Sequence, residues 1–448
     1  MGVGTRELAL EVLLKTAEEG VPGHVALGAV LSKYQFLPKQ DRAFLTRLVE
    51  GTMEYVILID FVAGQYSRVP VSKMKPLIRE IIRMSIYQLL FMDSVPESAV
   101  VNEAVKLTQK RGFYHLKPFV NGLLRTVARE KDHINYPKEE EGVEEYLSVK
   151  YSCPEFLIRR WLPLYGREKT EAIVASFLGK RPVMVRVRPG YSVEEVKKSL
   201  LAQGAEVEQG PYLPYCLVIS GFDHVYALDV FREGKVWVMD VGSMLVGEVC
   251  APKKGDVCLD LCAAPGGKSL LLGDMMGDFG SVEARDVSEA KVALIDEAIA
   301  RAGSINVTTK VADALVFDLD AELSADLVLA DVPCSGFGVL GRKPDMKLSS
   351  LEERVAGLVP IQRAILENAA LYVKSRGVLV YSTCTISQEE NEDNVRWFTE
   401  NHPFALESLD PFLPEELHRE STREGYLQLL PGVDQSDGFF MARFRRKA

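Results

Sequence analysis

Two cysteines and an aspartate stand where apolar strand patterns end, and their side chains could do nucleophilic chemistry. Asp331 and Cys334 follow the apolar run "ADLVLAD", and Cys384 ends the run "GVLVYSTC". A thiolate is a strong nucleophile in covalent catalysis, and a carboxylate can hydrogen-bond a reacting group. A lone cysteine is most often a small buried hydrophobic residue. Two cysteines at adjacent strand ends favour a chemical role.

The remaining cysteines give no sign of a disulfide framework or a metal site. The chain has seven cysteines, at positions 153, 216, 250, 258, 262, 334 and 384. They form no Cys-x-x-Cys pair and their number is odd, which argues against both. We therefore expect no metal, and any chemical role belongs to single thiols.

A turn rich in small residues, "DLCAAPGGKS" (residues 260–269), lies between a strand pattern and a helix pattern. Alanines and glycines allow the backbone to approach a ligand closely, and the helix that follows offers unpaired N–H groups. The turn is not Gly-x-Gly-x-x-Gly, and Pro265 removes one N–H, so a dinucleotide pyrophosphate is poorly served. The turn predicts a different nucleotide-type site.

Two further acids extend this site. Asp286 ends the next strand pattern, and Asp313 follows the one after it. Asp286 can accept hydrogen bonds from both ribose hydroxyls, and Asp313 can accept one from the amino group of adenine. Either acid alone is more often an ordinary loop or capping residue. Together with the glycine turn they favour an adenosyl ligand without a pyrophosphate, and S-adenosylmethionine fits that description.

The elements that must position these residues lie in the second half of the chain. From residue 237 onward, apolar strands alternate with helical patterns; the expected strands are "DVCLDL", "GSVEARDV", "NVTTKVAD", "ADLVLAD" and "GVLVYSTC". This alternation predicts a Rossmann-like, doubly wound α/β sheet. Ligands of such sheets bind at the carboxyl ends of the strands, which is where the acids and the two cysteines stand.

The first half of the chain has a different pattern. Residues 5–130 repeat apolar residues at helical spacing, and residues 133–147, with a proline and a run of acids, are typical of a linker. Helical patterns over 154–178 are followed by a strand, a helix and a strand. We therefore expect a multidomain protein, with an all-α domain over 1–135, linker helices and a small α/β module over 146–236, and the Rossmann-like domain over 237–448.

Charge is distributed unevenly along the chain. The formal net charge is −10, yet residues 1–236 hold 32 Lys and Arg against 29 acids, and residues 237–448 hold 21 against 34. Because phosphate neutralisation drives nucleic-acid binding, the first half is the better nucleic-acid surface. Residues 101–132 are basic with interleaved aromatics, and a flexible loop after Cys334 adds Arg342, Lys343 and Lys347. A solvated helical face explains residues 101–132 equally well.

No segment has the pattern of a membrane span. The longest apolar stretches are broken by charges or glycines before the roughly 18 residues that a span needs. The first residues, "MGVGTRELALEVLLKTAEEG", place acids where the apolar core of a signal peptide would stand. We expect no membrane contact and a cytoplasmic location.

Four motifs resemble those of the RNA 5-methylcytosine methyltransferases: "DLCAAPGGKS", "DVPCSGFG", "YSTCTISQEENE" and "SDGFFMARFRR". The segments "QDRAFLTRLVEGTMEY", "RMSIYQLLFMDSVPESAVVNEAVKL" and "FVNGLLRTVARE" resemble the NusB-like domain that the bacterial Sun/Fmu family (ribosomal RNA small-subunit methyltransferase B) joins to that enzyme. The resemblance covers nearly the whole chain. It departs between residues 177 and 245, where Met239 stands in place of the usual glutamine.

The resemblance implies a role for each motif residue. Carbon 5 of cytosine is a poor nucleophile, so a thiolate must first add to carbon 6. By resemblance Cys384 is this nucleophile, Asp331 hydrogen-bonds the base, and Cys334 helps the adduct to break after methyl transfer. The DNA enzymes use the cysteine of the Pro-Cys motif as nucleophile instead. The implied S-adenosylmethionine site consists of Cys262, Ala263, Ala264, Pro265, Gly266, Gly267, Lys268, Asp286, Asp313 and Asp331.

The resemblance also implies the substrate. The NusB-like domain and the middle module would bind RNA, and the target would be a cytosine of 16S ribosomal RNA, at position 967 in standard numbering, methylated by a monomer. Two alternatives remain: a related enzyme acting on tRNA or another ribosomal site, and a non-catalytic RNA-binding assembly factor. Since every motif residue is intact, the methyltransferase is the favoured hypothesis.

Overall fold

The computed structural model describes residues 4–448 except 180–181, 223, 278 and 349–350. The chain divides into two compact units. The first is drawn from Met1–Gly179 and Leu340–Leu351, and the second from Lys180–Val339 and Glu352–Ala448. Each unit is described separately below.

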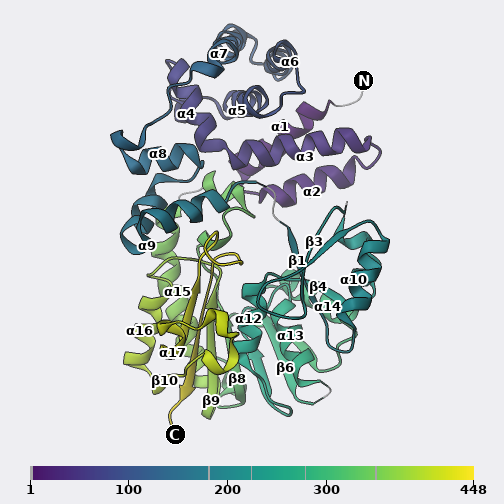
Figure 1. Ribbon diagram of the computed structural model, residues 1–448, viewed down its shortest axis with the longest axis vertical. Helices are drawn as coiled ribbons and strands as arrows, with labels where there is room; N and C mark the ends of the chain where they lie inside the picture. Colours follow the sequence, from purple (N-terminus) through teal and green to yellow (C-terminus); the bar gives the residue numbers. More distant parts are fainter. Residues whose placement is uncertain (1–3, 180–181, 223, 278, 349–350) are drawn as a thin grey trace. The chain divides into compact units, whose positions relative to one another are not determined.

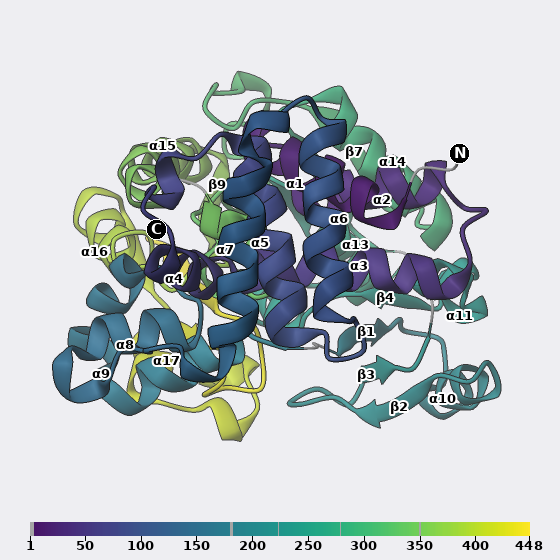
Figure 2. The same cartoon turned by 90° about the horizontal axis from the view of Figure 1, so that it is seen from above.

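The first unit is helical (Figure 1). Its helices are α1 (Thr5–Glu19), α2 (Gly23–Lys33), α3 (Lys39–Glu54), α4 (Val56–Tyr66), α5 (Pro76–Phe91), α6 (Glu97–Lys110), α7 (Lys117–Glu130), α8 (Val143–Lys150) and α9 (Glu155–Ser176). The helices α5, α6 and α7 pack side by side (Figure 2).

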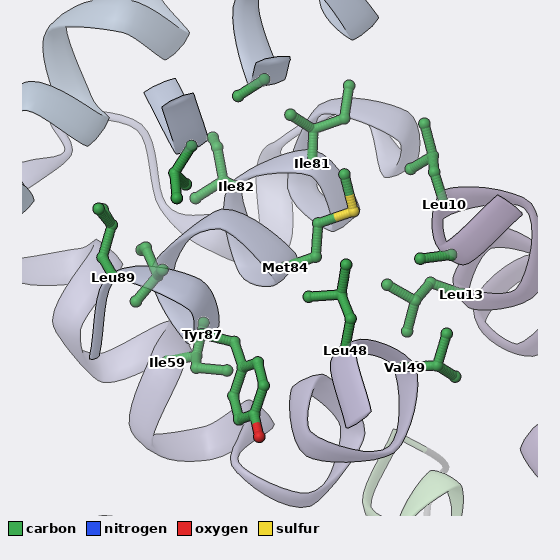
Figure 3. Packing of buried hydrophobic residues seen from close by; sticks show 14 of the residues in the cluster. Leu10, Leu13, Leu48, Val49, Ile59, Ile81, Ile82, Met84, Tyr87 and Leu89 are labelled. Atoms are coloured by element: carbon green, nitrogen blue, oxygen red, sulfur yellow. The ribbon is translucent and has the colours of Figure 1, made fainter. Parts of the chain in front are cut away.

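Helix α5 is the centre of this unit because its sequence is apolar on several faces. Ile81, Ile82, Met84 and Leu89 are all buried, and they meet side chains from α1, α3 and α4 (Figure 3). Polar residues of α5 are buried as well, and Arg83 and Glu80 pair with each other over 2.8 Å, so this helix is covered on nearly all sides. The helical spacing expected for residues 5–130 therefore marks a helix bundle with one enclosed helix.

A segment from the second half of the chain belongs to this helical unit. Residues Pro344–Leu348 form a short 3₁₀ turn that packs on α3. Met346 and Lys347 are buried there, and Lys347 Nζ donates to the main-chain oxygen of Glu54, at the end of α3, over 2.7 Å. A cation at a helix carboxyl end meets unpaired carbonyl groups. Lys347 is thus part of a docked segment, whereas the sequence had suggested a flexible basic loop.

The second unit begins with a small antiparallel sheet in the order β2-β3-β1-β4. Its elements are β1 (Val183–Val187), α10 (Val193–Ala202), β2 (Glu206–Gln209), β3 (Cys216–Ser220), α11 (Asp229–Arg232) and β4 (Val236–Val238). The helix α10 contacts β2 and supplies Val196 and Leu200 to the core of this module. This is the small α/β module that the sequence predicts.

A buried ion-pair cluster ties this module to the large sheet. Arg186, in β1, and Arg188, which directly follows β1, both bind Asp274 of helix α13 (Gly267–Met276), over 2.7 and 2.8 Å. Arg186 is almost fully buried. Breaking such a buried pair by removing one partner is costly, because a charge is left uncompensated.

The large sheet has the order β10-β12-β9-β8-β5-β6-β7, with β11 paired to β12. Its strands are β5 (Val257–Asp260), β6 (Ser281–Asp286), β7 (Val307–Val311), β8 (Ala325–Asp331), β9 (Val373–Thr383), β10 (Phe404–Leu406), β11 (Tyr426–Leu429) and β12 (Phe439–Arg446). Strands β5 to β9 are parallel, as predicted, and β12 adds an antiparallel strand beside β9. Its helices are α12 (Val241–Cys250), α13, α14 (Glu289–Ala302), α15 (Leu351–Tyr372), α16 (Glu392–Asn401) and α17 (Glu420–Glu424).

Alternate side chains of each strand face opposite helix layers. On β8, Leu327 and Leu329 join the core under α12 and α13, while Val328 and Ala330 join the core under α15. The two helix layers flank the strands in Figure 1. Sheets covered on both faces need apolar residues at successive positions, which is why these strands read as continuous apolar runs.

The predicted fold class is confirmed: a helical domain, a small α/β module and a Rossmann-like sheet. Among the residues that the structure describes, no helix is long and apolar enough to cross a membrane.

Candidate active site

The two candidate catalytic cysteines face each other at the carboxyl ends of neighbouring strands. β8 and β9 are parallel, with Asp331 opposite Ser382, so Cys334 and Cys384 follow the same edge of the sheet. Both thiols are half-buried, and their Sγ atoms lie 3.3 Å apart. The fold thus brings together two cysteines that lie far apart in the sequence.

The thiol of Cys334 is held in its protonated form. Its hydrogen bond with Cys384 and its burial raise its pKa well above the usual value of a cysteine. A protonated Cys334 can donate its S–H to the sulfur of Cys384, and such a bond favours a thiolate at the acceptor. One thiol of the pair can therefore stabilise a thiolate at the other sulfur by donating its S–H.

Asp331 lies beside the thiols and is held by two donors. Lys268 Nζ lies 2.7 Å from its Oδ2 atom, and Ser382 Oγ lies 2.7 Å from its Oδ1 atom. Burial disfavours the Lys268 ammonium, but the charges of Asp331, Asp260 and Cys384 outweigh it, and the pKa of Lys268 is raised. Lys268 thus stays a cation next to Asp331 and within the field of Cys384.

The glycine turn joins β5 to α13 tightly. The N–H of Gly266 donates to the oxygen of Ala263 over 2.7 Å, and the N–H of Ala263 donates to the oxygen of Arg285 over 2.8 Å. Gly266 has a φ of 100°, which side chains rarely allow. Gly267 begins α13, so the unpaired N–H groups of this helix start at the turn.

The other cysteines have a different environment. Burial raises the pKa of Cys153 and Cys216 to about 12, and it also raises the pKa of Cys250, Cys258 and Cys262. These thiols act as small buried hydrophobic groups. Cys262, in the glycine turn, is half-buried and packs against the core under α15.

Asp286 ends β6 and already has donors from the protein. The N–H of Ala264 lies 3.0 Å from Oδ2, and Oδ1 accepts from the N–H of Val287 over 2.8 Å and from Lys291 Nζ over 2.9 Å. The carboxylate thus fixes the glycine turn to β6. Because the Lys291 side chain is 54% exposed, it can swing into solvent and give its place to a ligand hydroxyl.

Asp313 is exposed just beyond β7. Its Oδ1 atom accepts from the N–H of Leu315 over 2.9 Å, so the residue caps the turn that follows. The exposed carboxylate can also accept a hydrogen bond from a ligand. Val287 and Leu315, at the ends of β6 and β7, are about half exposed and offer apolar surface beside the two acids.

Asp260 is a site residue that the sequence reasoning left without a role. It is fully buried; Oδ2 accepts from Ser269 Oγ over 2.6 Å, while Oδ1 has no hydrogen-bond partner in the part of the chain that the structure describes. Burial, aided by the charge of Asp331, raises its pKa to about 7. No local pattern distinguishes this acid from the other strand-end acids.

These acceptors fit S-adenosylmethionine. Its ammonium group, ribose hydroxyls and adenine amino group are all donors, and acids stand at the ends of β8, β5, β6 and β7, which are neighbours in the sheet. The unpartnered Oδ1 atom of Asp260 adds an acceptor where the glycine turn begins. Among the described residues, no three His, Cys, Asp or Glu side chains gather as metal ligands would.

The sequence reasoning also missed a buried polar network behind the two cysteines. Its members are fully buried residues of α15, the end of β9 and the segments that follow β8 and β9: Ser335, Gln362, Thr383, Thr385, Glu390 and Asn391. Glu390 and Asn391 belong to the run "SQEENEDN" after Cys384, whose acidic and polar side chains would ordinarily lie in solvent. Their spacing after the strand was a usable signal, but their burial was not visible.

In the helical unit, basic residues of the stretch 101–132 have acidic partners. Lys106 contacts Glu103, and Lys110 lies 2.6 Å from Glu7. Arg111 lies near Glu7 as well. The positive charge that the sequence suggests for RNA is thus partly neutralised on the protein.

Comparison with known proteins covers nearly the whole chain. Residues 248–445 match the family described as 16S rRNA methyltransferase RsmB/F, residues 4–129 match the NusB family, and residues 153–225 match the ferredoxin-like domain of Methyltr_RsmF/B-like proteins.

Individual relatives match over their full length. The "Probable ribosomal RNA small subunit methyltransferase B" of Bacillus subtilis (strain 168) is 36% identical, over 99% of this chain and 98% of the relative. That of Synechocystis sp. is 30% identical, over 99% and 100%. The crystal structure of PH0851 is 29% identical, with a TM-score of 0.83 over 100% of both chains.

Proposed function

The chain belongs to the family of ribosomal RNA small subunit methyltransferases B, and we propose that it methylates carbon 5 of a cytosine in 16S ribosomal RNA, at position 967, from S-adenosylmethionine. The observation that carries this proposal is the pair of thiols 3.3 Å apart, beside the ion pair of Asp331 and Lys268. Nucleophile, proton donor and base-binding acid are all present at one edge.

The first step belongs to Cys384. Its thiolate adds to carbon 6 of the cytosine, which makes carbon 5 enamine-like and nucleophilic. The Lys268 cation and the S–H of Cys334 favour the thiolate before attack. Asp331, fixed by Lys268 and Ser382, hydrogen-bonds the base at nitrogen 3 or its amino group and stabilises the adduct.

The methyl donor would be held by the glycine turn, with Asp286 at the ribose, Asp313 at the adenine amino group, and Asp260 and Asp331 near the ammonium group. When bound, S-adenosylmethionine supplies the methyl group as an electrophile on its sulfonium. The residues of the chain orient the base against it and exclude water from the adduct.

Release belongs to Cys334. Cys334, as a thiolate, takes the proton from carbon 5; the electron pair of that C–H bond re-forms the double bond to carbon 6, and the C6–S bond breaks, which releases the thiolate of Cys384. Once Cys384 is bound to carbon it is uncharged, so a main cause of the raised pKa of Cys334 is removed. Cys334 is then better able to take part in proton transfer.

We propose a monomer that acts in the cytoplasm, where ribosomal RNA is assembled.

Replacing each cysteine tests this function. Cys384→Ala should abolish methylation of 16S rRNA and leave no RNA bound after denaturation, because the attacking thiolate is gone. Cys334→Ala should still attack carbon 6 and allow methyl transfer to carbon 5, but release is impaired, so a protein–RNA conjugate should accumulate on a denaturing gel. The conjugate should require both S-adenosylmethionine and Cys384.

The opposite pattern is also informative. A conjugate in Cys384→Ala and none in Cys334→Ala would reverse the two roles. Normal methylation by both variants would mean that the thiols only fill space. Bisulfite sequencing of RNA from a deletion strain identifies the target, and loss of the mark in tRNA instead of 16S rRNA would refute the substrate.

A further inference from the structure

We propose that Glu390 and Asn391, two neighbouring buried residues, position the two catalytic thiols separately: Glu390 holds Cys334 and Asn391 holds Cys384. The proposal rests on the function proposed above and adds a division of labour to it. Neither residue touches a reacting atom, so both are positioning residues.

Glu390 holds the loop of Cys334 on both sides. Its Oε2 atom accepts from the N–H of Ser335 over 2.8 Å, and its Oε1 atom accepts from the hydroxyl of Ser335 over 2.5 Å. Gln362 Nε2 donates to Glu390 Oε2 over 2.8 Å and to the oxygen of Pro333 over 3.0 Å. The residues before and after Cys334 are thus tied to one carboxylate.

Asn391 holds the strand end of Cys384 in the same way. Its Oδ1 atom accepts from the hydroxyl of Thr383 over 2.7 Å, and its Nδ2 atom donates to the oxygen of Thr385 over 3.0 Å. The residues before and after Cys384 are thus tied to one amide. Asn391 precedes α16, so a rigid helix anchors both holding residues.

The two halves also meet directly. The hydroxyls of Ser335 and Thr385, each the neighbour of a catalytic cysteine, lie 2.7 Å apart. The N–H of Gly338 donates to the oxygen of Cys384 over 3.1 Å, so more than one contact sets the separation of the loops that carry the thiols.

The cost of this arrangement argues for a function. Glu390 is 0% exposed, and the donors on its carboxylate, Ser335 and Gln362, are uncharged. A buried carboxylate is unfavourable unless fully hydrogen-bonded, and apolar packing would fill the same space more cheaply. The carboxylate instead accepts several hydrogen bonds, which fix the loop of Cys334 in place.

The two residues should therefore fail in opposite ways. A loosened Cys334 loop impairs release, so Glu390→Ala should accumulate the protein–RNA conjugate and lower turnover by up to about 100-fold, the cost of an ångström-scale displacement. A loosened Cys384 impairs attack, so Asn391→Ala should lose both turnover and conjugate. Glu390→Gln, in which the hydroxyls can reverse their bonds, should accumulate less conjugate than Glu390→Ala.

The experiment compares these variants of the full chain with 16S rRNA and S-adenosylmethionine, read as product and as conjugate on a denaturing gel. Asp393→Ala is the matched control, because this acid of the same segment pairs with Arg396 of its own helix, and it should behave as wild type. Ser335→Ala removes the hydroxyl that donates to Glu390, and this variant should accumulate conjugate like Glu390→Ala. Melting temperature identifies variants that have lost their fold.

The possible outcomes distinguish a failure of the positioning proposal from a failure of the proposed methyltransferase function. If Cys334→Ala accumulates conjugate while Glu390→Ala and Ser335→Ala, both folded, lose activity without it, the positioning role of Glu390 is refuted and the function stands. Conjugate accumulation by Asn391→Ala refutes the division of labour. Methylation by Cys384→Ala refutes the function itself. Should Glu390→Ala not fold, Ser335→Ala decides.

Discussion

Asp260 and Asp331 lie at the ends of neighbouring strands, β5 and β8, yet their surroundings differ. Asp331 has a lysine cation 2.7 Å away, whereas Asp260 is fully buried with a hydroxyl on one oxygen and no partner for the other among the described residues. Burial therefore raises the pKa of Asp260 to about 7, from 3.8. Asp260 should therefore keep its proton to a much higher pH than a solvated carboxyl does.

This difference predicts a pH dependence of stability. In the folded chain Asp260 stays neutral up to about pH 7, whereas in the unfolded chain it ionises near pH 3.8. The folded state binds more protons between these values, so the free energy of unfolding should fall as pH rises through this window, by at most about 4 kcal/mol. Asp260→Asn should remove that part of the fall, measured as melting temperature against pH.

The comparison with wild type tests the direction of this pH dependence of stability. Asp260→Asn should gain stability relative to wild type from pH 4 to pH 7, and no further above pH 7. A difference that stays constant over the window, or that grows in favour of wild type, would contradict the raised pKa. Ser269→Ala serves as the second variant, because it removes the hydroxyl on Oδ2 and leaves the carboxyl in place.

Single residues also show which parts of the candidate site could be predicted from the sequence. Cys334, Cys384 and Asp331 were predictable, because a reactive residue type at the end of an apolar run stands out in the sequence. Glu390 and Asn391 did not stand out in the sequence, since polar residues after a strand are usually solvated. Their burial depends on Ser335 and Gln362, which lie far away in the chain.

At the scale of elements, β12 is the main addition to the predicted sheet. It runs antiparallel to β9 and begins at Phe439, directly after Gly438. The N–H of Gly438 donates to the oxygen of Gly338 over 2.9 Å, and the N–H of Gly338 donates to the oxygen of Cys384 over 3.1 Å. The motif "SDGFFMARFRR" was recognised in the sequence, but its pairing with β9 depends on long-range contacts.

This close approach predicts the effect of one added methyl group. A Cβ atom on Gly338 would lie 2.1 Å from the main-chain oxygen of Gly438, so backbone must move. Gly338→Ala should lower the free energy of unfolding by about 1–3 kcal/mol, the usual cost of overpacking. It should also lower methylation, because the N–H of Gly338 holds the oxygen of Cys384.

A second glycine is the control. Gly357 lies exposed in α15, and a Cβ atom there meets nothing within 4 Å. Gly357→Ala should therefore raise stability by about 0.5–1 kcal/mol and leave methylation unchanged. Denaturant unfolding measures both variants, and equal stability of the two would contradict the backbone contact.

At the scale of the whole molecule, the first half remains the better candidate for binding RNA, but its charges are held internally. Glu7 contacts both Lys110 and Arg111, and Glu11 contacts Arg111. These pairs are partly exposed and so contribute little stability. Their acids instead compete with phosphate for the same cations.

Removing these acids should strengthen RNA binding. Glu7→Gln with Glu11→Gln leaves Lys110 and Arg111 for phosphate, so affinity should rise and the log–log dependence on salt should steepen by up to about 2. Glu18→Gln with Glu19→Gln, at exposed positions on the same helix, controls for net charge. If only the control variant binds more tightly, RNA docks on another surface. Filter binding at several salt concentrations gives both values.

The docked turn Pro344–Leu348 makes the two halves of the gene interdependent. Lys347 bonds to Glu54 across 293 residues of sequence, within one compact unit. A chimaera that exchanged only the first 179 residues between relatives would leave Met346 and Lys347 to pack on an unfamiliar α3. We therefore expect working hybrids to need both parts from one parent, and changes in α3 to be inherited together with changes in residues 340–351.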